Sequence, residues 1–301
     1  MNATLKQAAH SLSVAKIILF ALGCITIFVA VAAVTQLLTF WISNQTAKTV
    51  AGEILIRMPL TIVALHLFAI KVIKTYNPSA IYGKPILVKL LKWTAIAFIL
   101  PLSVGLFYCL FNFMAPLAHT IPLAITGKLG IFITWLSISI SAGITEEVLF
   151  RGHLFMIIRN RCSVAQSIFI TSLTFGLVHI VMLPSFTLLD VIIVTAGGTV
   201  AGLMFSMIYV YGRSVWYVAI VHIVWNIFFI GKITAVAATQ VDANKIITPF
   251  KLTTHSQWLT GGSFGVEAAL PSLVLYLLVI GLLYKLMGSG KSSDETGTLR
   301  V

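Results

Sequence analysis

The residues best suited to chemistry are two adjacent glutamates, Glu146 and Glu147, in a chain that has only eight acidic residues. On a helix, residues four apart share a face, so Glu147 is predicted to pair with Arg151 while Glu146 points about 100° away. The two glutamates are thereby divided into one partnered and one free carboxylate. A free carboxylate among apolar side chains can act as a general base or acid. The structural alternative is an ion cluster at a helix end.

Two histidines and an amide form the second group of candidates. His179 follows Phe175 by four residues, and His222 precedes Asn226 by four. Imidazole and amide groups can donate hydrogen bonds to a developing oxyanion. Together with a free carboxylate, these groups are sufficient for hydrolysis without a covalent nucleophile. Zinc is the rival chemistry, because Glu146, His179 and His222 could bind it and leave a position open for water. The zinc-protease pattern His-Glu-x-x-His is absent, so the leading mechanism requires no cofactor and a divalent metal stays an open alternative.

The composition decides which elements must position these residues. With 59% hydrophobic and 9% charged residues and a mean hydropathy of +1.03, the chain is not a cytosolic enzyme or a nucleic-acid binder. We predict an all-α polytopic membrane protein, one membrane domain over residues 1–301, whose partners are the lipid bilayer and a membrane-associated peptide or protein, and no nucleic acid. The polar tail, residues 288–301, is expected to be disordered. Eight segments approach the length of about 20 apolar residues that spans a bilayer: 17–41, 55–73, 93–115, 129–157, 164–184, 187–211, 214–231 and 268–287.

Counting along the predicted helices places the candidates at one depth. Glu146 lies 13 residues before a turn near 159–163, and His179 lies 16 residues after it. At about 1.5 Å of rise per residue both are about 20 to 24 Å from the turn. Asn226 lies 13 residues after Arg213, on a helix that starts from the same side. The sequence therefore predicts a polar layer inside the membrane, and such buried ionisable groups usually serve a function.

The basic residues predict the orientation. With an even number of spans, fourteen Lys and Arg residues fall on the side of both termini and six on the other. Because basic residues mark cytoplasmic loops, we expect both termini in the cytoplasm of a multi-pass protein of the bacterial inner membrane. The long loop 231–267 is expected to link two helices rather than to cover a site. Gly198 and Gly202 should let their helix pack closely inside the bundle.

These candidate residues resemble the motifs of a known family. Its three motifs correspond to Glu146-Glu147-x-x-x-Arg151, Phe175-x-x-x-His179 and His222-x-x-x-Asn226, in this order and on successive predicted helices. They resemble the CPBP (CAAX protease and bacteriocin-processing) family of intramembrane proteases, which includes the type II CAAX prenyl endopeptidase. The likeness covers a catalytic core of about residues 129–231 and shows no departure at the motif positions.

The resemblance implies a glutamate-dependent endopeptidase with an eight-helix core and a site that opens toward the cytoplasm. By resemblance, Glu146 would activate water with help from His179, while His222 and Asn226 would stabilise the oxyanion. The substrate would be a membrane-associated protein, of the prenylated CAAX type if the likeness extends so far.

The same resemblance assigns supporting roles. Glu147 and Arg151 would orient the site, and Phe175 would pack behind it. Members of the family have also been described as metal-dependent, so the metal question stays open on this ground too.

Two other classes of function stay open. A non-catalytic binding protein or bacteriocin self-immunity protein could keep the polar layer as a network that holds helices together. A proton-coupled transporter could use Glu and His at membrane depth as a relay, although the chain shows no internal repeat, which counts against a transporter.

Overall fold

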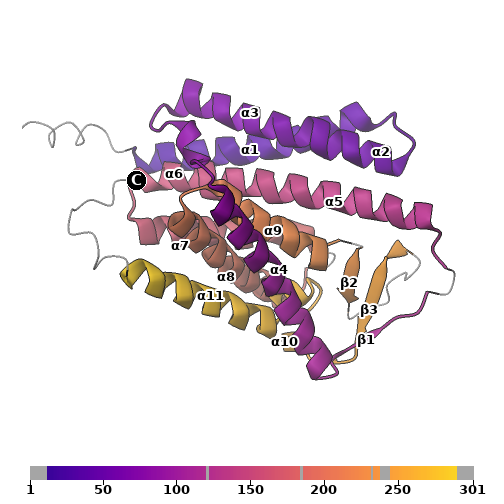
Figure 1. Cartoon of the computed structure of the whole chain (residues 1–301). Coiled ribbons are helices and arrows are strands. Elements are labelled where there is room, and N and C mark those ends of the chain that lie inside the picture. Colours follow the sequence, from indigo (N-terminus) through magenta and orange to yellow (C-terminus); the bar gives the residue numbers. More distant parts are fainter. Residues whose placement is uncertain (1–11, 120–121, 184–185, 232, 238–244, 290–301) are drawn as a thin grey trace, which may run out of the picture.

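The computed structural model describes residues 12–119, 122–183, 186–231, 233–237 and 245–289, and it is mostly helical (Figure 1). Seven helical rods in the described residues are long and apolar enough to cross a membrane. An eighth apolar helix, α9 (Val215–Phe229), is shorter. The predicted all-α polytopic class is therefore confirmed. The rods are α1 (Val14–Thr39), a rod over 45–73, α4 (Leu87–Leu110), a rod over 125–159, α7 (Val164–Val178) with the 3-10 turn η5 (His179–Met182), α8 (Leu188–Gly212) and α11 (Leu270–Ser289).

Two of the rods change helix type along their length. The first consists of α2 (Gln45–Val50), the π-helical η1 (Ala51–Arg57), α3 (Met58–Phe68) and the π-helical η2 (Ala69–Ile73). The second consists of α5 (Ile125–Glu147), the π-helical η4 (Val148–Leu154) and α6 (Phe155–Arg159). π-helical turns within α-helices are frequent at functional sites, and η4 begins directly after Glu147.

The second span is longer than the sequence suggested. We expected it to start near residue 55, but its helix begins at Gln45, where the Asn44 side chain accepts a hydrogen bond from the Ala47 backbone N–H at 2.9 Å. An Asn at this position satisfies a backbone donor that a helix start leaves unpaired. The first turns are polar, which is why hydropathy alone missed them.

A small sheet that the sequence did not predict joins two loops. Its order is β1-β3-β2, with β1 (Met114–Pro116) antiparallel to β3 (Thr248–Leu252) and β2 (Thr234–Ala237) parallel to β3. It lies at the end of the bundle where α5 begins (Figure 1). Strands of three to five residues from distant parts of the chain carry no readable alternation of their own. The remaining short elements are η3 (Pro78–Ile81), α10 (Gln257–Thr260) and η7 (Val266–Ala268).

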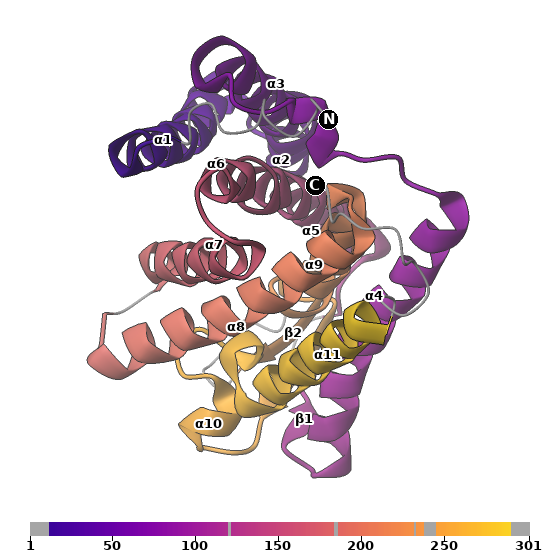
Figure 2. The same cartoon turned by 90° about the vertical axis from the view of Figure 1, so that its left-hand side faces the viewer.

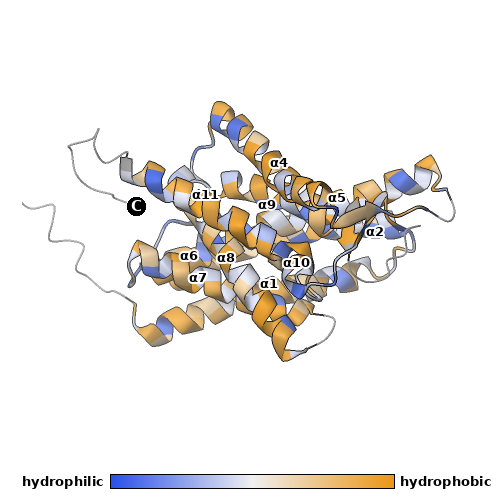
Figure 3. Cartoon of the chain, turned by 90° about the horizontal axis from the view of Figure 1, so that it is seen from below, coloured by the Kyte–Doolittle hydropathy of each residue, from blue (hydrophilic) through white to orange (hydrophobic). Residues whose placement is uncertain are grey.

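The short helix α9 lies inside the bundle. It contacts α4, α5 and α8, and the end-on view in Figure 2 shows these helices and α11 around it. Most residues of the spans are hydrophobic (Figure 3), and many of their large hydrophobic side chains are exposed. Such a surface suits contact with lipid.

The helices α7 and α8 pack closely through small residues. A Cβ added at Gly198 would lie 2.8 Å from the Cα of Gly176, and one at Gly202 would lie 2.9 Å from the Cα of Ser172. The prediction that Gly198 and Gly202 bring their helix close to a neighbour is confirmed.

The C-terminal end differs slightly from expectation. The helix α11 continues through Ser289, so the first two residues of the tail predicted to be disordered are helical. The rest of that tail, 290–301, lies outside the described residues. The single-domain reading of the chain and the cytoplasmic placement of both termini stay predictions.

Candidate functional site

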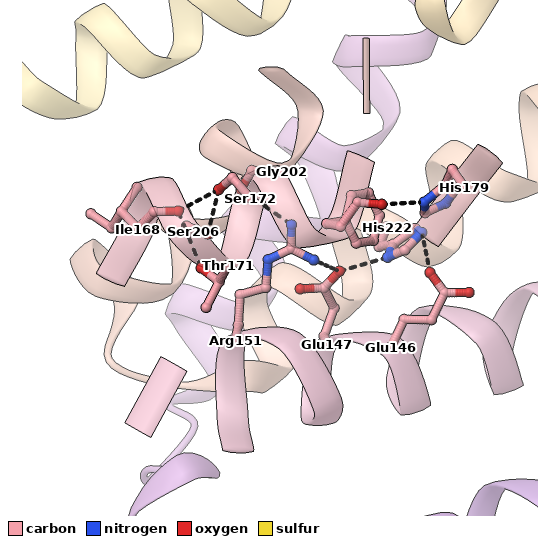
Figure 4. A network of polar contacts seen from close by, with 11 residues as sticks. Glu146, Glu147, Arg151, Ile168, Thr171, Ser172, His179, Gly202, Ser206 and His222 are labelled. Atoms are coloured by element: carbon pink, nitrogen blue, oxygen red, sulfur yellow. Dashed lines mark hydrogen bonds and ion pairs between the residues drawn. The ribbon is translucent and has the colours of Figure 1, made fainter. Parts of the chain in front are cut away.

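A fully buried ion pair lies at the end of α5. Arg151 Nη1 donates to Glu147 Oε1 at 2.9 Å, and Arg151 Nη2 donates to the backbone carbonyl oxygen of Gly202 on α8 at 3.1 Å (Figure 4). The predicted pairing of Glu147 with Arg151 is therefore confirmed. Because a buried charge is costly unless it is paired and hydrogen-bonded, this pair ties the rod over 125–159 to α8.

The same carboxylate oxygen also holds a histidine. His222 Nδ1 lies 2.7 Å from Glu147 Oε1, and both side chains are buried. Because an ionised carboxylate only accepts hydrogen bonds, Nδ1 donates and the other ring nitrogen is left to face the neighbouring glutamate. His222 Nε2 lies 3.9 Å from Glu146 Oε2. Glu147 thus sets the orientation of the imidazole, as carboxylate partners of functional histidines commonly do.

His179 is oriented by the backbone. It caps the end of α7, and its Nδ1 lies 2.7 Å from the carbonyl oxygen of Phe175. A carbonyl oxygen only accepts, so Nδ1 carries the proton and Nε2 is an acceptor. The ring is half-buried and packs on Phe175 with centroids 4.3 Å apart. Within the part of the chain that the structure describes, His179 makes no hydrogen bond or ion pair to Glu146.

Asn226 lies one helical turn beyond His222 on α9 and is buried. Among the described residues its side-chain Oδ1 has no hydrogen-bond partner. Buried amides are normally satisfied, so this oxygen is open to a hydrogen-bond donor.

Aromatic rings enclose the ion pair and the histidines. The guanidinium carbon of Arg151 lies 4.4 Å from the ring centroid of Phe175 and 5.2 Å from that of Phe205. Phe175 also contacts His222, with centroids 6.1 Å apart. A cation over an aromatic face is stabilised by the ring quadrupole. Phe175 therefore lies behind the site, where the resemblance placed it.

Phe205 was missed at the sequence level. It stacks on His222 with centroids 4.8 Å apart and ring planes inclined by 22°. The available signal was its spacing of three residues from Gly202, which places both on one face of α8. Nothing in that spacing indicates contact with a histidine on another helix.

A small cavity of about 30 Å³ lies beside the two histidines. A buried water needs about 10 to 15 Å³ of such volume, so the cavity has room for water. Residues from α7, η5, α8, α9, α11 and the segment before α11 line it, among them His179, His222, Trp225, Phe264, Glu267 and Tyr276.

The segment before α11 covers the site, so the expectation that loop 231–267 only links two helices was wrong. Phe264 contacts the His179 ring with centroids 5.9 Å apart. Gly261 and Gly262 both have positive φ, 72° and 63°, a backbone conformation that glycine adopts without strain. This turn folds the segment back over the cavity, and a simple length argument could not foresee it.

The three side chains named as conditional zinc ligands, Glu146, His179 and His222, do not form a metal site as placed. Within the described ranges no three His, Cys, Asp or Glu side chains are grouped closely enough to hold a metal ion. Nδ1 of each histidine is bonded to a protein oxygen, which leaves Nε2 as the nitrogen that could bind a metal. Whether the site binds a divalent metal is therefore a question for experiment.

Comparison with known families agrees with the motif assignment. Residues 128–228, about a third of the chain, match the family model described as type II CAAX prenyl endopeptidase Rce1-like. The matched stretch runs from the first turn of α5 to the end of α9 and contains all three motifs. No curated protein and no solved structure matches the chain. The resemblance to the CPBP family of intramembrane proteases is therefore confirmed for residues 128–228.

Proposed function

We propose that the protein is an intramembrane endopeptidase that hydrolyses a peptide bond of a membrane-associated protein with water activated by Glu146. The observation that supports this most is the approach of His222 Nε2 to within 3.9 Å of Glu146 Oε2, with His222 fixed from behind by Glu147. A base and a hydrogen-bond donor are thereby held together within membrane helices, and the donor, His222, lines a cavity that can hold water. Catalytic contacts are often long before substrate binds.

In this mechanism Glu146 removes a proton from water as the water oxygen attacks the peptide carbonyl carbon. His179 Nε2 accepts a hydrogen bond from the same water and orients it. The proton held by Glu146 then passes to the amine nitrogen as the C–N bond breaks. General acid–base catalysis of this kind contributes about 10² to 10⁴ in rate.

The oxyanion formed by that attack is stabilised by His222 and Asn226. In its protonated form His222 donates from both nitrogens, from Nδ1 to Glu147 and from Nε2 into the site. The side-chain Nδ2–H of Asn226, which lies on the same face of α9, supplies a second donor. Removal of one such donor typically costs about 10² to 10³ in kcat.

The membrane and the family suggest the substrate. A prenylated CAAX-type protein would reach the site with its lipid in the bilayer and its peptide near the polar layer. We propose that the end of the bundle carrying the turn between α6 and α7 faces the cytoplasm, since most basic residues lie on that side.

Peptide cleavage by the purified full-length chain in detergent micelles tests the proposal. A mixed library of lipidated and plain membrane peptides is incubated with wild type, Glu146→Ala and His179→Ala, and products are identified by mass spectrometry. New termini should appear with wild type and disappear in both variants. His66→Ala, which removes a histidine of α3, is the matched control and should retain cleavage. Retained cleavage in both site variants would refute the mechanism.

A further inference from the structure

One acidic residue of the cavity lies outside all three motifs and outside the family match. Glu267 is in the 3-10 turn η7, just before α11. It lines the same cavity as His179 and His222, although it follows the end of the matched region by 39 residues. The folded-back segment that covers the site is what brings it there.

Several contacts hold Glu267 in place. The Trp225 indole N–H donates to Glu267 Oε2 at 3.2 Å, and the Tyr276 hydroxyl donates to the Glu267 backbone oxygen at 3.2 Å. The rings of Trp225 and Tyr276 pack with centroids 5.2 Å apart, and Ser272 Oγ donates to the Val266 carbonyl oxygen at 2.6 Å. The carboxyl group therefore has a defined position rather than a freely rotating one.

The other carboxyl oxygen of Glu267 is free to act. Among the described residues Oε1 takes part in no hydrogen bond or ion pair, and the side chain is only partly buried. Since Oε2 is held by Trp225, Oε1 is the oxygen available to a molecule in the cavity.

The surroundings of Glu267 favour its neutral form. The pKa of Glu267 is raised from 4.5 to about 7, chiefly by burial; within that net change the Trp225 hydrogen bond and His222 lower the pKa, and the negative charge of Glu146 raises it. A neutral carboxylic acid can donate a hydrogen bond, and enzymes use buried acids in this way. The titratable groups on the elements around it are Glu146 on α5, His179 at the end of α7, Asp190 at the start of α8, His222 on α9 and Tyr276 on α11.

We propose that Glu267 is a further residue of the active site, whose Oε1–H donates a hydrogen bond to the substrate peptide bound beside His179 and His222. This inference rests on the proposed function. It adds η7, which lies outside the family core, to the elements that supply active-site residues.

The pH dependence of kcat/KM tests this role, measured on a peptide that wild type cleaves and Glu146→Ala does not. Wild type should lose about tenfold in kcat/KM per pH unit above about pH 7, as the neutral acid is lost. Glu267→Gln keeps a neutral donor and an acceptor for Trp225, so its kcat/KM should fall by up to about tenfold, while the decline above pH 7 disappears. Glu267→Leu removes the donor and should lose about 10²-fold at every pH.

Two controls make the result specific. Glu53→Gln changes a glutamate of η1 that does not line the cavity. It should keep the wild-type pH profile of kcat/KM. Trp225→Phe removes the hydrogen bond that lowers the pKa of Glu267, so its decline should start at higher pH.

Each other outcome has a clear meaning. If wild type cleaves and Glu267→Gln has the wild-type pH profile, Glu267 is structural and the inference alone fails. If Glu267→Gln is folded but inactive at every pH, the residue transfers its proton and the hydrogen-bond role is wrong. If no peptide is cleaved in a Glu146-dependent way, the proposed function fails and the inference falls with it.

Discussion

Glu147 Oε1 and His222 Nδ1 lie 2.7 Å apart, joining α5 to α9 across 75 residues of sequence. The same oxygen accepts the hydrogen bond of Arg151 Nη1, so one atom is shared by an arginine and a histidine that lie on different helices. Any change of charge at Glu147 therefore acts on helix packing and on the orientation of the imidazole together.

Replacing Glu147 by Gln should destabilise the protein by about 3 to 5 kcal/mol, because it leaves the buried Arg151 charge without its partner. The matched control is Glu53→Gln, which breaks another i,i+4 Glu–Arg pair, at 3.2 Å, whose side chains are partly exposed. That control should cost about 0 to 1 kcal/mol. Thermal unfolding in detergent measures the stability of both variants. Equal losses of stability would show that the buried pair stabilises the protein no more than the partly exposed pair.

Replacing Glu146 by Gln should abolish cleavage and leave stability nearly unchanged. Among the described residues the Glu146 carboxylate makes only the 3.9 Å approach to His222, and its side chain is 20% exposed, so little packing depends on its charge. Activity and melting temperature are measured on the same preparation. A large loss of stability would instead favour a non-catalytic network, as in a binding or self-immunity protein.

Replacing Gly198 by Ala should separate α7 from α8, because the new Cβ would lie 2.8 Å from the Cα of Gly176. Overpacking of this kind typically costs about 1 to 3 kcal/mol. Since His179 follows Gly176 on the same helix, cleavage should fall by about 10²-fold, the size of effect that a misplacement of about 1 Å produces. Gly281→Ala on α11 is the control, since a Cβ there meets nothing within 4 Å. Similar losses of cleavage in both variants would contradict the close-packing argument.

Stability should depend on pH through Glu267. Its pKa is raised by burial in the folded protein, from 4.5 to about 7, so the folded state binds a proton more tightly than the unfolded chain. The stabilisation is complete below about pH 4.5 and is lost as pH rises through about 7. Glu267→Gln should remove this dependence. Melting temperatures of wild type and variant, compared from pH 4 to 8, give the measurement; parallel curves would show that Glu267 titrates normally.

The parts of the fold and site that follow from regular helix geometry could be predicted from the sequence. The pairing of Glu147 with Arg151 follows from spacing alone. A constant rise per residue was enough to predict one depth for Glu146, His179 and Asn226. These quantities are fixed by the backbone and do not depend on which helices meet. The catalytic roles of Glu146, His179, His222 and Asn226 stay predictions.

The parts of the fold and site that depend on contacts between distant segments could not be predicted from the sequence. Phe205 reaches His222 only because α8 packs beside α9. Glu267 reaches the cavity only because a turn at Gly261 and Gly262 reverses a loop. The sheet forms because β1 and β3 lie on loops that the helices bring together. In each case the residues can be read from the sequence, but no local pattern indicates which distant residue they contact.

The helix that carries His222 and Asn226 is only 15 residues long, a rise of about 22 Å. A hydrocarbon layer is about 30 Å thick, so α9 alone cannot cross it. Its last backbone groups fold into a tight end, where the N–H groups of Ile230 and Gly231 both donate to the Asn226 carbonyl oxygen. Backbone that ends at membrane depth is tolerated only where protein buries it, and α4, α5 and α8 pack against α9. The short length of α9 therefore makes it depend on its neighbouring helices for a place in the membrane, and it keeps His222 and Asn226 buried in protein and away from lipid.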